Sequence, residues 1–171
     1  MAAFMFTARL RILALATFNV LWTAGVNQLN LNPLVALTSV GFRHSKLLHL
    51  AATEKLYQLN TFDNLGVEQL YKSAAFKDWV VPMNLGDPAR ETVKGHELDH
   101  YLTILRDGRE KTLAEFRKRD DAWLLAVDKT WPWGPTNNLC KWFHVCEHES
   151  HHTGQISLLK SRTPGAKAEN G

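Results

Sequence analysis

Apolar side chains recur with the 3.6-residue period of an amphipathic helix in several segments of this chain. The pattern predicts four long helices, at about residues 7–28, 42–59, 97–119 and 136–160. It is clearest in the third of these, where one side of the helix is apolar and the other carries Asp107, Arg109, Glu110 and Lys111. No segment of useful length alternates polar and apolar residues, as a strand would. The sequence therefore predicts an all-α fold.

Turn-forming residues separate the predicted helices. Residues 30–33 end the first helix, and residues 131–135 (WPWGP) break the chain before the last, whose start offers good N-cap residues. Residues 80–94, which contain Pro82, Gly86 and Pro88, predict a loop or crossover after a shorter helical piece at 67–75. We therefore expect one domain over residues 1–165, a four-helix bundle with a long crossover between helices 2 and 3, followed by a disordered tail at 166–171.

Charge and cysteine content narrow the class of protein. The 171 residues carry a net charge of +3 and show no stripe of Lys and Arg interleaved with aromatic residues, so nucleic-acid binding gains no support. Cys140 and Cys146 face different sides of one predicted helix, so they cannot easily form a disulfide with each other. We therefore expect reduced thiols and a cytoplasmic protein. Cys146 is expected to be a buried, inert thiol. The apolar run at residues 12–21 is too short to span a bilayer and is interpreted as helix core rather than a signal peptide.

The predicted last helix carries a cluster of histidines. His144, His148 and His152 follow at intervals of four residues, and two imidazoles at this spacing can grip one metal ion from adjacent turns. A third ligand must then come from another helix. His49 is the candidate, because it lies on the apolar face of the second helix, where an unsatisfied imidazole would be costly. The same residues are also compatible with hydrogen-bonded core or surface histidines, and the pattern alone leaves both interpretations open.

Other histidines and one short motif fit the metal hypothesis less well. His44, His96 and His100 show no such arrangement. His151 is expected to face solvent or a residue that hydrogen-bonds to one of the metal-binding histidines. Residues 148–152 (HESHH) match the H-E-x-x-H motif of zinc proteases. A protease of that kind takes a third ligand further along the chain, and no histidine follows His152. A metalloprotease is therefore disfavoured.

Three stretches resemble the DinB/YfiT-like superfamily. They are residues 142–156 (WFHVCEHESHHTGQI), residues 49–57 (HLAATEKLY), and residues 98–113 (LDHYLTILRDGREKTL) with 121–124 (DAWL) after them, so the resemblance covers about residues 42–165. It implies a four-helix bundle, often a homodimer, with a three-histidine site for zinc, nickel or a similar divalent ion. Carried over to this chain, the ligands are His49, His148 and His152. Members of the family include bacillithiol-dependent S-transferases and mycothiol-dependent isomerases.

The leading functional expectation is a metal-dependent S-transferase that moves a low-molecular-weight thiol onto an electrophile. Three neutral imidazoles leave a divalent ion with an open position, and such an ion can bind sulfur and favour the thiolate. A bundle in which the metal is only structural, and a hydrolase that uses metal-bound water, remain alternatives. Glu54, Glu147 and Glu149 can orient imidazole N–H groups or face solvent, and solvent is the stronger expectation for Glu149.

Overall fold

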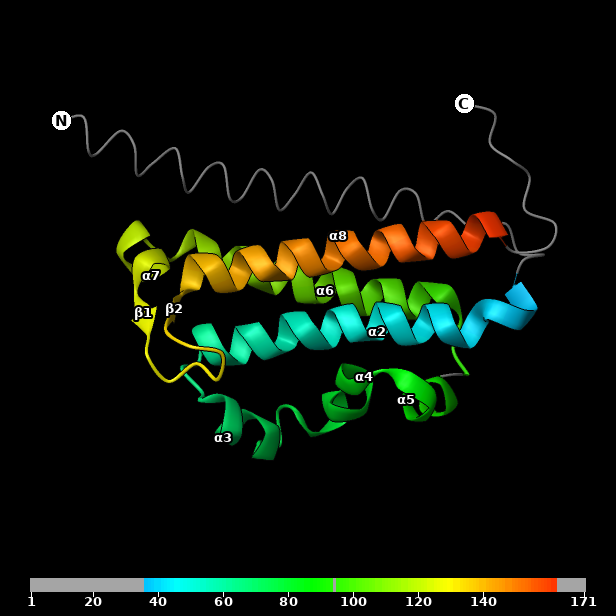
Figure 1. Cartoon of the computed structure of the whole chain (residues 1–171), viewed down its shortest axis with the longest axis horizontal. Coiled ribbons are helices and arrows are strands. Elements are labelled where there is room, and N and C mark those ends of the chain that lie inside the picture. The colour runs from blue at the N-terminus through cyan, green and yellow to red at the C-terminus, as the bar shows by residue number, and fades with distance from the viewer. Residues whose placement is uncertain (1–35, 94, 163–171) are drawn as a thin grey trace, which may run out of the picture.

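Three long helices dominate the computed structural model, which describes residues 36–93 and 95–162. They are α2 (Ala36–Thr61), α6 (Leu98–Arg117) and α8 (Asn138–Arg162). The three lie side by side, and α2 packs against both of the others (Figure 1). The all-α class is thus confirmed for these residues, while the predicted first helix at 7–28 and the tail at 166–171 lie outside them. No described helix is long and apolar enough to cross a membrane.

Local chemistry explains where α8 and α2 begin. The Asn137 side chain accepts a hydrogen bond of 2.8 Å from the Cys140 backbone N–H, which caps α8 where the sequence predicted its start. The beginning of α2 was predicted too late, because the helix starts at Ala36 and runs through Gly41. One internal glycine costs a helix only about 1 kcal/mol, so it does not end one.

The crossover between α2 and α6 is confirmed, but the expectation of a loop at residues 80–94 was wrong. Residues 80–92 instead form two short helices, α4 (Val80–Asn84) and α5 (Gly86–Thr92). Before them, the crossover contains α3 (Val67–Lys72), which agrees with the shorter helical piece expected at 67–75, and the 3₁₀ turn η2 (Lys77–Trp79). α2 and α6 run in the same direction (Figure 1). The chain must therefore return alongside α2, which is about 39 Å long, before α6 begins. Pro82 is compatible with α4 because it stands in the first turn, where a missing backbone N–H costs nothing.

A short connection joins α6 to α8 and was only partly predicted. It contains α7 (Asp121–Leu125) and a two-residue antiparallel ladder between β1 (Val127–Asp128) and β2 (Thr136–Asn137), which the sequence did not indicate. Buried Lys141 of α8 holds this connection to the bundle. Its Nζ donates to Asp128 Oδ2 and to Asn60 Oδ1, both at 2.8 Å, and lies 4.5 Å from the centroid of the Trp131 ring.

The core consists of two apolar clusters with a polar layer between them along all three long helices. One cluster contains Leu56, Tyr57, Leu59, Leu70, Phe76, Trp131, Trp142 and Val145. The other contains Leu47, Leu50, Ala51, Val93, Tyr101, Leu105 and Ile156. The buried polar residues that fall between them along the helices are Thr53 and Glu54 on α2, Arg109 and Thr112 on α6, and Glu149 and His152 on α8, and buried His49 lies one turn before Thr53 on α2. Because buried polar groups need partners, this layer is where the structure concentrates its chemistry.

Candidate metal centre

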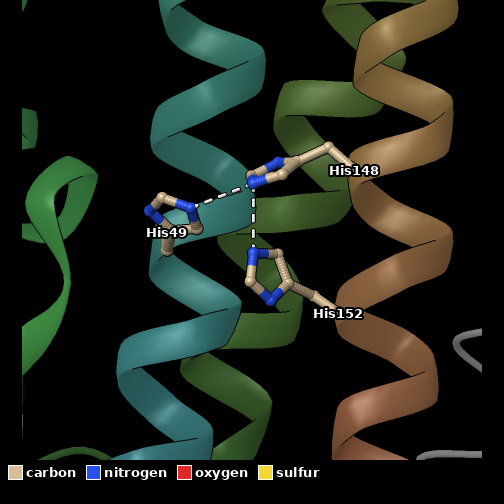
Figure 2. Close-up of side chains that lie close together, drawn as sticks. All are labelled: His49, His148 and His152. Atoms are coloured by element: carbon tan, nitrogen blue, oxygen red, sulfur yellow. Dashed lines mark hydrogen bonds between the residues drawn. The ribbon is translucent and has the colours of Figure 1, made fainter.

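The structure brings the three histidines named from the sequence to one point. His49 projects from α2, and His148 and His152 project from successive turns of α8, so that the three rings face one another (Figure 2). His49 Nε2 lies 3.2 Å from His148 Nε2, and His152 Nε2 lies 3.0 Å from the same atom. One ligand atom from each residue lies within 4.8 Å of the other two. His49 and His152 are buried, whereas His148 is half-buried.

Hydrogen bonds on the outer nitrogens fix the tautomers of two of the rings. His49 Nδ1 lies 3.0 Å from the Pro82 carbonyl oxygen, which can only accept, so this nitrogen carries the proton. His152 Nδ1 lies 2.9 Å from Gln155 Oε1, which also accepts from Lys46 Nζ at 2.6 Å. His152 Nδ1 therefore carries its ring proton as well. The Nε2 atoms of His49 and His152 are consequently lone-pair donors that point toward the centre of the cluster.

Hydrogen bonding alone leaves this cluster unsatisfied. His148 Nε2 lies between the two lone pairs and carries one proton at most, so it satisfies only one of them. A shared divalent ion accepts all three lone pairs. At bond lengths of about 2.0–2.1 Å in a tetrahedron, its nitrogen ligands lie about 3.4 Å apart. The distances of 3.2 and 3.0 Å are close to that spacing. The residues therefore fit a metal ion, and an ion with three protein ligands keeps an open position.

Burial keeps the three imidazoles neutral, the form that binds metal. Desolvation, together with the neighbouring histidines, lowers the pKa of His148 to about 3. The pKa of His152 is lowered to about 4, mainly by burial, and the pKa of His49 is lowered for the same reason. A metal ion therefore does not have to displace a proton from any of these rings at neutral pH.

A hydrogen-bonded chain from α2 to the surface orients His152. Gln155 Oε1 accepts from Lys46 Nζ and from His152 Nδ1, and Gln155 Nε2 lies 2.7 Å from Nε2 of the exposed His151. Lys46 Nζ also lies 3.2 Å from His152 Nδ1, and both of these nitrogens donate to the same amide oxygen. Because the amide is fixed at both ends, it holds the His152 ring in the tautomer that directs Nε2 to the cluster.

Replacing Gln155 by leucine is expected to weaken divalent-metal binding by about 10–100-fold, the usual effect of removing a partner that orients a ligand. The leucine keeps the volume of the side chain but leaves the His152 Nδ1 proton without an acceptor. Competition with a chromogenic chelator measures the affinity. Gln69→Leu is the matched control, because Gln69 is exposed on α3. Equal affinities for the two variants would contradict the role given to Gln155.

The remaining histidines lie outside the three-residue group. His151 is exposed, as expected, and His144 is exposed with its Nδ1 3.3 Å from Glu147 Oε2. His44 is buried and stacks on Tyr101, with 4.4 Å between the ring centroids, and His96 stacks on His100 at 4.1 Å.

The carboxylates expected near the ligands form a separate buried network. Arg109 Nη2 donates to Glu149 Oε2 at 2.7 Å, and Arg109 Nε lies 3.3 Å from Glu54 Oε1, which also accepts from Thr112 Oγ1 at 2.5 Å. The expectations of a solvent-exposed Glu149 and of Arg109 on the polar side of its helix were therefore wrong. Glu147 is exposed. Arg109 was missed because one arginine among other charges does not signal burial in a single sequence.

The two thiols are free, and they differ in exposure. Cys140 is exposed, whereas burial raises the pKa of Cys146 to about 12. Since the thiolate is the reactive form, we expect one fast-reacting thiol per chain when the folded protein is titrated with a disulfide reagent at pH 8. Cys140→Ala should remove that reaction and Cys146→Ala should not. A fast reaction that survives Cys140→Ala would contradict this assignment.

No family model, curated protein or solved structure matches the chain. The geometry of the cluster and the chemistry of its donors therefore carry the functional argument.

Proposed function

We propose that this chain binds one divalent metal ion, zinc or nickel, through His49, His148 and His152 and uses it to transfer a low-molecular-weight thiol to an electrophile. The observation that carries the proposal is the convergence of three neutral imidazoles, two of them with Nε2 lone pairs fixed by bonds on the opposite nitrogen. An all-nitrogen site of this kind suits zinc and nickel. The proposal also places the chain among DinB/YfiT-like proteins, as a four-helix bundle that forms a homodimer in the cytoplasm.

The ion would lower the pKa of a bound thiol, so that sulfur reacts as the thiolate at neutral pH. Three neutral ligands leave the full 2+ charge of the ion to act on that sulfur. The protein itself orients the metal-binding rings and shields them from water. The Pro82 carbonyl and Gln155 hold the His49 and His152 rings, and the burial of these side chains limits competition from water.

In the proposed reaction, the thiol loses its proton to solvent and its sulfur forms a bond to an electrophilic carbon. The bond from that carbon to its leaving group breaks, and the leaving group departs with the electron pair. A chlorinated substrate releases chloride. An epoxide opens to an alkoxide, which takes up a proton. No oxidant or reductant is consumed in either case, so the reaction needs only the thiol, the electrophile and the metal.

Incubation of the zinc-loaded or nickel-loaded protein with a panel of thiols and with a chlorinated or epoxide electrophile tests the proposal. We expect thiol to be consumed and a thioether to form at a rate that depends on metal. His148→Ala, which removes the ligand shared by the two short nitrogen contacts, should abolish the reaction. His100→Ala is the control, because His100 is exposed on α6 and contacts His96 and Tyr101 instead.

Two further measurements separate the alternatives: the melting temperature with and without metal, and the consumption of an epoxide or an ester without thiol. A purely structural metal would raise the melting temperature of the protein without any consumption of thiol. A metal-dependent hydrolase would consume an epoxide or an ester in the absence of thiol. Either result would overturn the transferase while leaving the metal site in place.

A further inference from the structure

The three rings of the metal centre are not held equally. His49 and His152 each have the outer nitrogen bonded, to Pro82 O and to Gln155 Oε1 respectively. His148 Nδ1 is buried and has no hydrogen-bond partner among the described residues. His148 is also the half-buried member of the group, whereas the other two are buried. His148 is therefore the ring with the least restraint and the one nearest to solvent.

His144 lies one turn before His148 on α8, on the side of the cluster that is open to solvent. Its ring stacks on the His148 ring, with 5.7 Å between centroids and 23° between planes. The side chain is 52% exposed, and its Nδ1 lies 3.3 Å from the carboxylate of Glu147, which is 63% exposed. An imidazole and a carboxylate thus meet at the surface, directly beside the least restrained ligand.

From this arrangement we propose that His144, Glu147 and His148 form an outer loading site for a divalent transition-metal ion, from which the ion passes to His49 and His152. Two histidines four residues apart on a helix hold one ion from adjacent turns, and here the His148 ring must turn its Nε2 from the cluster toward His144 to do so. His148 belongs to both sites, so it stays bound while His49 and His152 replace His144. The inference rests on the metal-binding part of the proposed function and is independent of thiol transfer.

Stepwise exchange explains why an exposed histidine and carboxylate lie beside a buried site. His49 and His152 are buried, so an ion that goes straight to them gains its first protein ligands away from the surface. Prior capture by His144 and His148 replaces water by nitrogen one ligand at a time. The negative charge of Glu147 raises the local concentration of cations, an effect that increases association rates by about tenfold or more in favourable cases.

Stopped-flow mixing of the metal-free protein with Co²⁺ tests the proposal, because the visible absorption of Co²⁺ reports its coordination directly. His144→Ala should slow association by about tenfold. Dissociation, measured by transfer to excess chelator, should slow by the same factor, so that the equilibrium affinity and the final spectrum stay those of the wild type. His100→Ala, which removes an exposed histidine of α6, is the matched control and should behave as the wild type. Glu147→Gln should slow association less, and its association rate should depend less on ionic strength than that of the wild type.

The outcomes separate the loading site from the metal centre itself. An association rate for His144→Ala equal to that of His100→Ala would overturn the loading site alone. Faster dissociation together with weaker affinity would overturn it too, because His144 would then be a ligand of the final site. If the wild-type protein does not bind Co²⁺, the loading site and the proposed function both fail. If it binds and loads through His144 but consumes no thiol, only the transferase fails.

Discussion

Replacement of Arg109 by alanine is expected to destabilise the protein by about 3–5 kcal/mol. The guanidinium is buried and lies against two carboxylates, at 2.7 Å from Glu149 and 3.3 Å from Glu54, and its loss leaves both without the charge that offsets them. At about 2–4 °C per kcal/mol for a chain of this size, the melting temperature should fall by about 10 °C. Chemical and thermal unfolding of the metal-free protein measure the effect.

Arg106→Ala is the matched control, because Arg106 lies on the same helix and forms an exposed ion pair at 3.5 Å with Asp99. A surface pair of this kind contributes about 0–1 kcal/mol. Equal stability of the two variants would show that the buried network contributes nothing. Replacing Arg109, Glu54 and Glu149 together by neutral residues of similar size should recover most of the loss, since no buried charge then remains.

The pH dependence of the Arg109→Ala variant provides a second check. Burial raises the pKa of Glu54 above its ordinary value of 4.5, and the Arg109 guanidinium opposes that rise. Without Arg109 the pKa of Glu54 rises further in the folded state. A group with a raised folded pKa contributes stability at low pH and loses it as the pH rises through that pKa. The variant should therefore lose stability more steeply than the wild type as the pH rises above about 5.

Addition of zinc or nickel to the metal-free protein is expected to raise its melting temperature by about 10 °C. An ion that binds only the folded state contributes about 4 kcal/mol when its free concentration is about a thousand times Kd. The ion satisfies the lone pairs of His49 and His152, which hydrogen bonds to the single His148 Nε2 cannot both satisfy. Differential scanning calorimetry with and without a chelator measures the shift.

The shift should disappear in His148→Ala and persist in His100→Ala. The comparison matters because exposed histidines bind transition metals weakly and without selectivity, and the chain has eight histidines in total. A shift of equal size in the two variants would place the bound metal elsewhere on the chain.

The sequence predicted the histidine cluster better than it predicted the surroundings of that cluster. A spacing of four residues places His148 and His152 on one face of a helix, and the position of His49 in an apolar pattern turns it inward. Helical periodicity therefore named the three candidates, and the family resemblance implied the same set. Periodicity does not show what lies outside the ligands. Pro82 O reaches His49 from the crossover, and Lys46 reaches Gln155 from 109 residues away along the chain.

The buried network shows why the remaining residues were not foreseen. Arg109 and Glu149 are charged, and charged side chains are usually exposed, so each was assigned to a solvated face. Their burial depends on each other and on Glu54, a relation between three helices that none of the helices reveals alone. The short helices α4 and α5 of the crossover were missed for a related reason. They pack against α2, and it is this packing rather than their own propensity that stabilises segments of five to seven residues.

The central claim is that His49, His148 and His152 hold one metal ion together, and elemental analysis of the purified protein tests it most directly. After saturation with zinc or nickel and gel filtration, we expect one ion per chain in the wild type and in His100→Ala. The stoichiometry should fall to near zero in His49→Ala and in His148→Ala, although these two residues lie 99 positions apart on different helices. One ion per chain retained in both of the ligand variants would contradict the account.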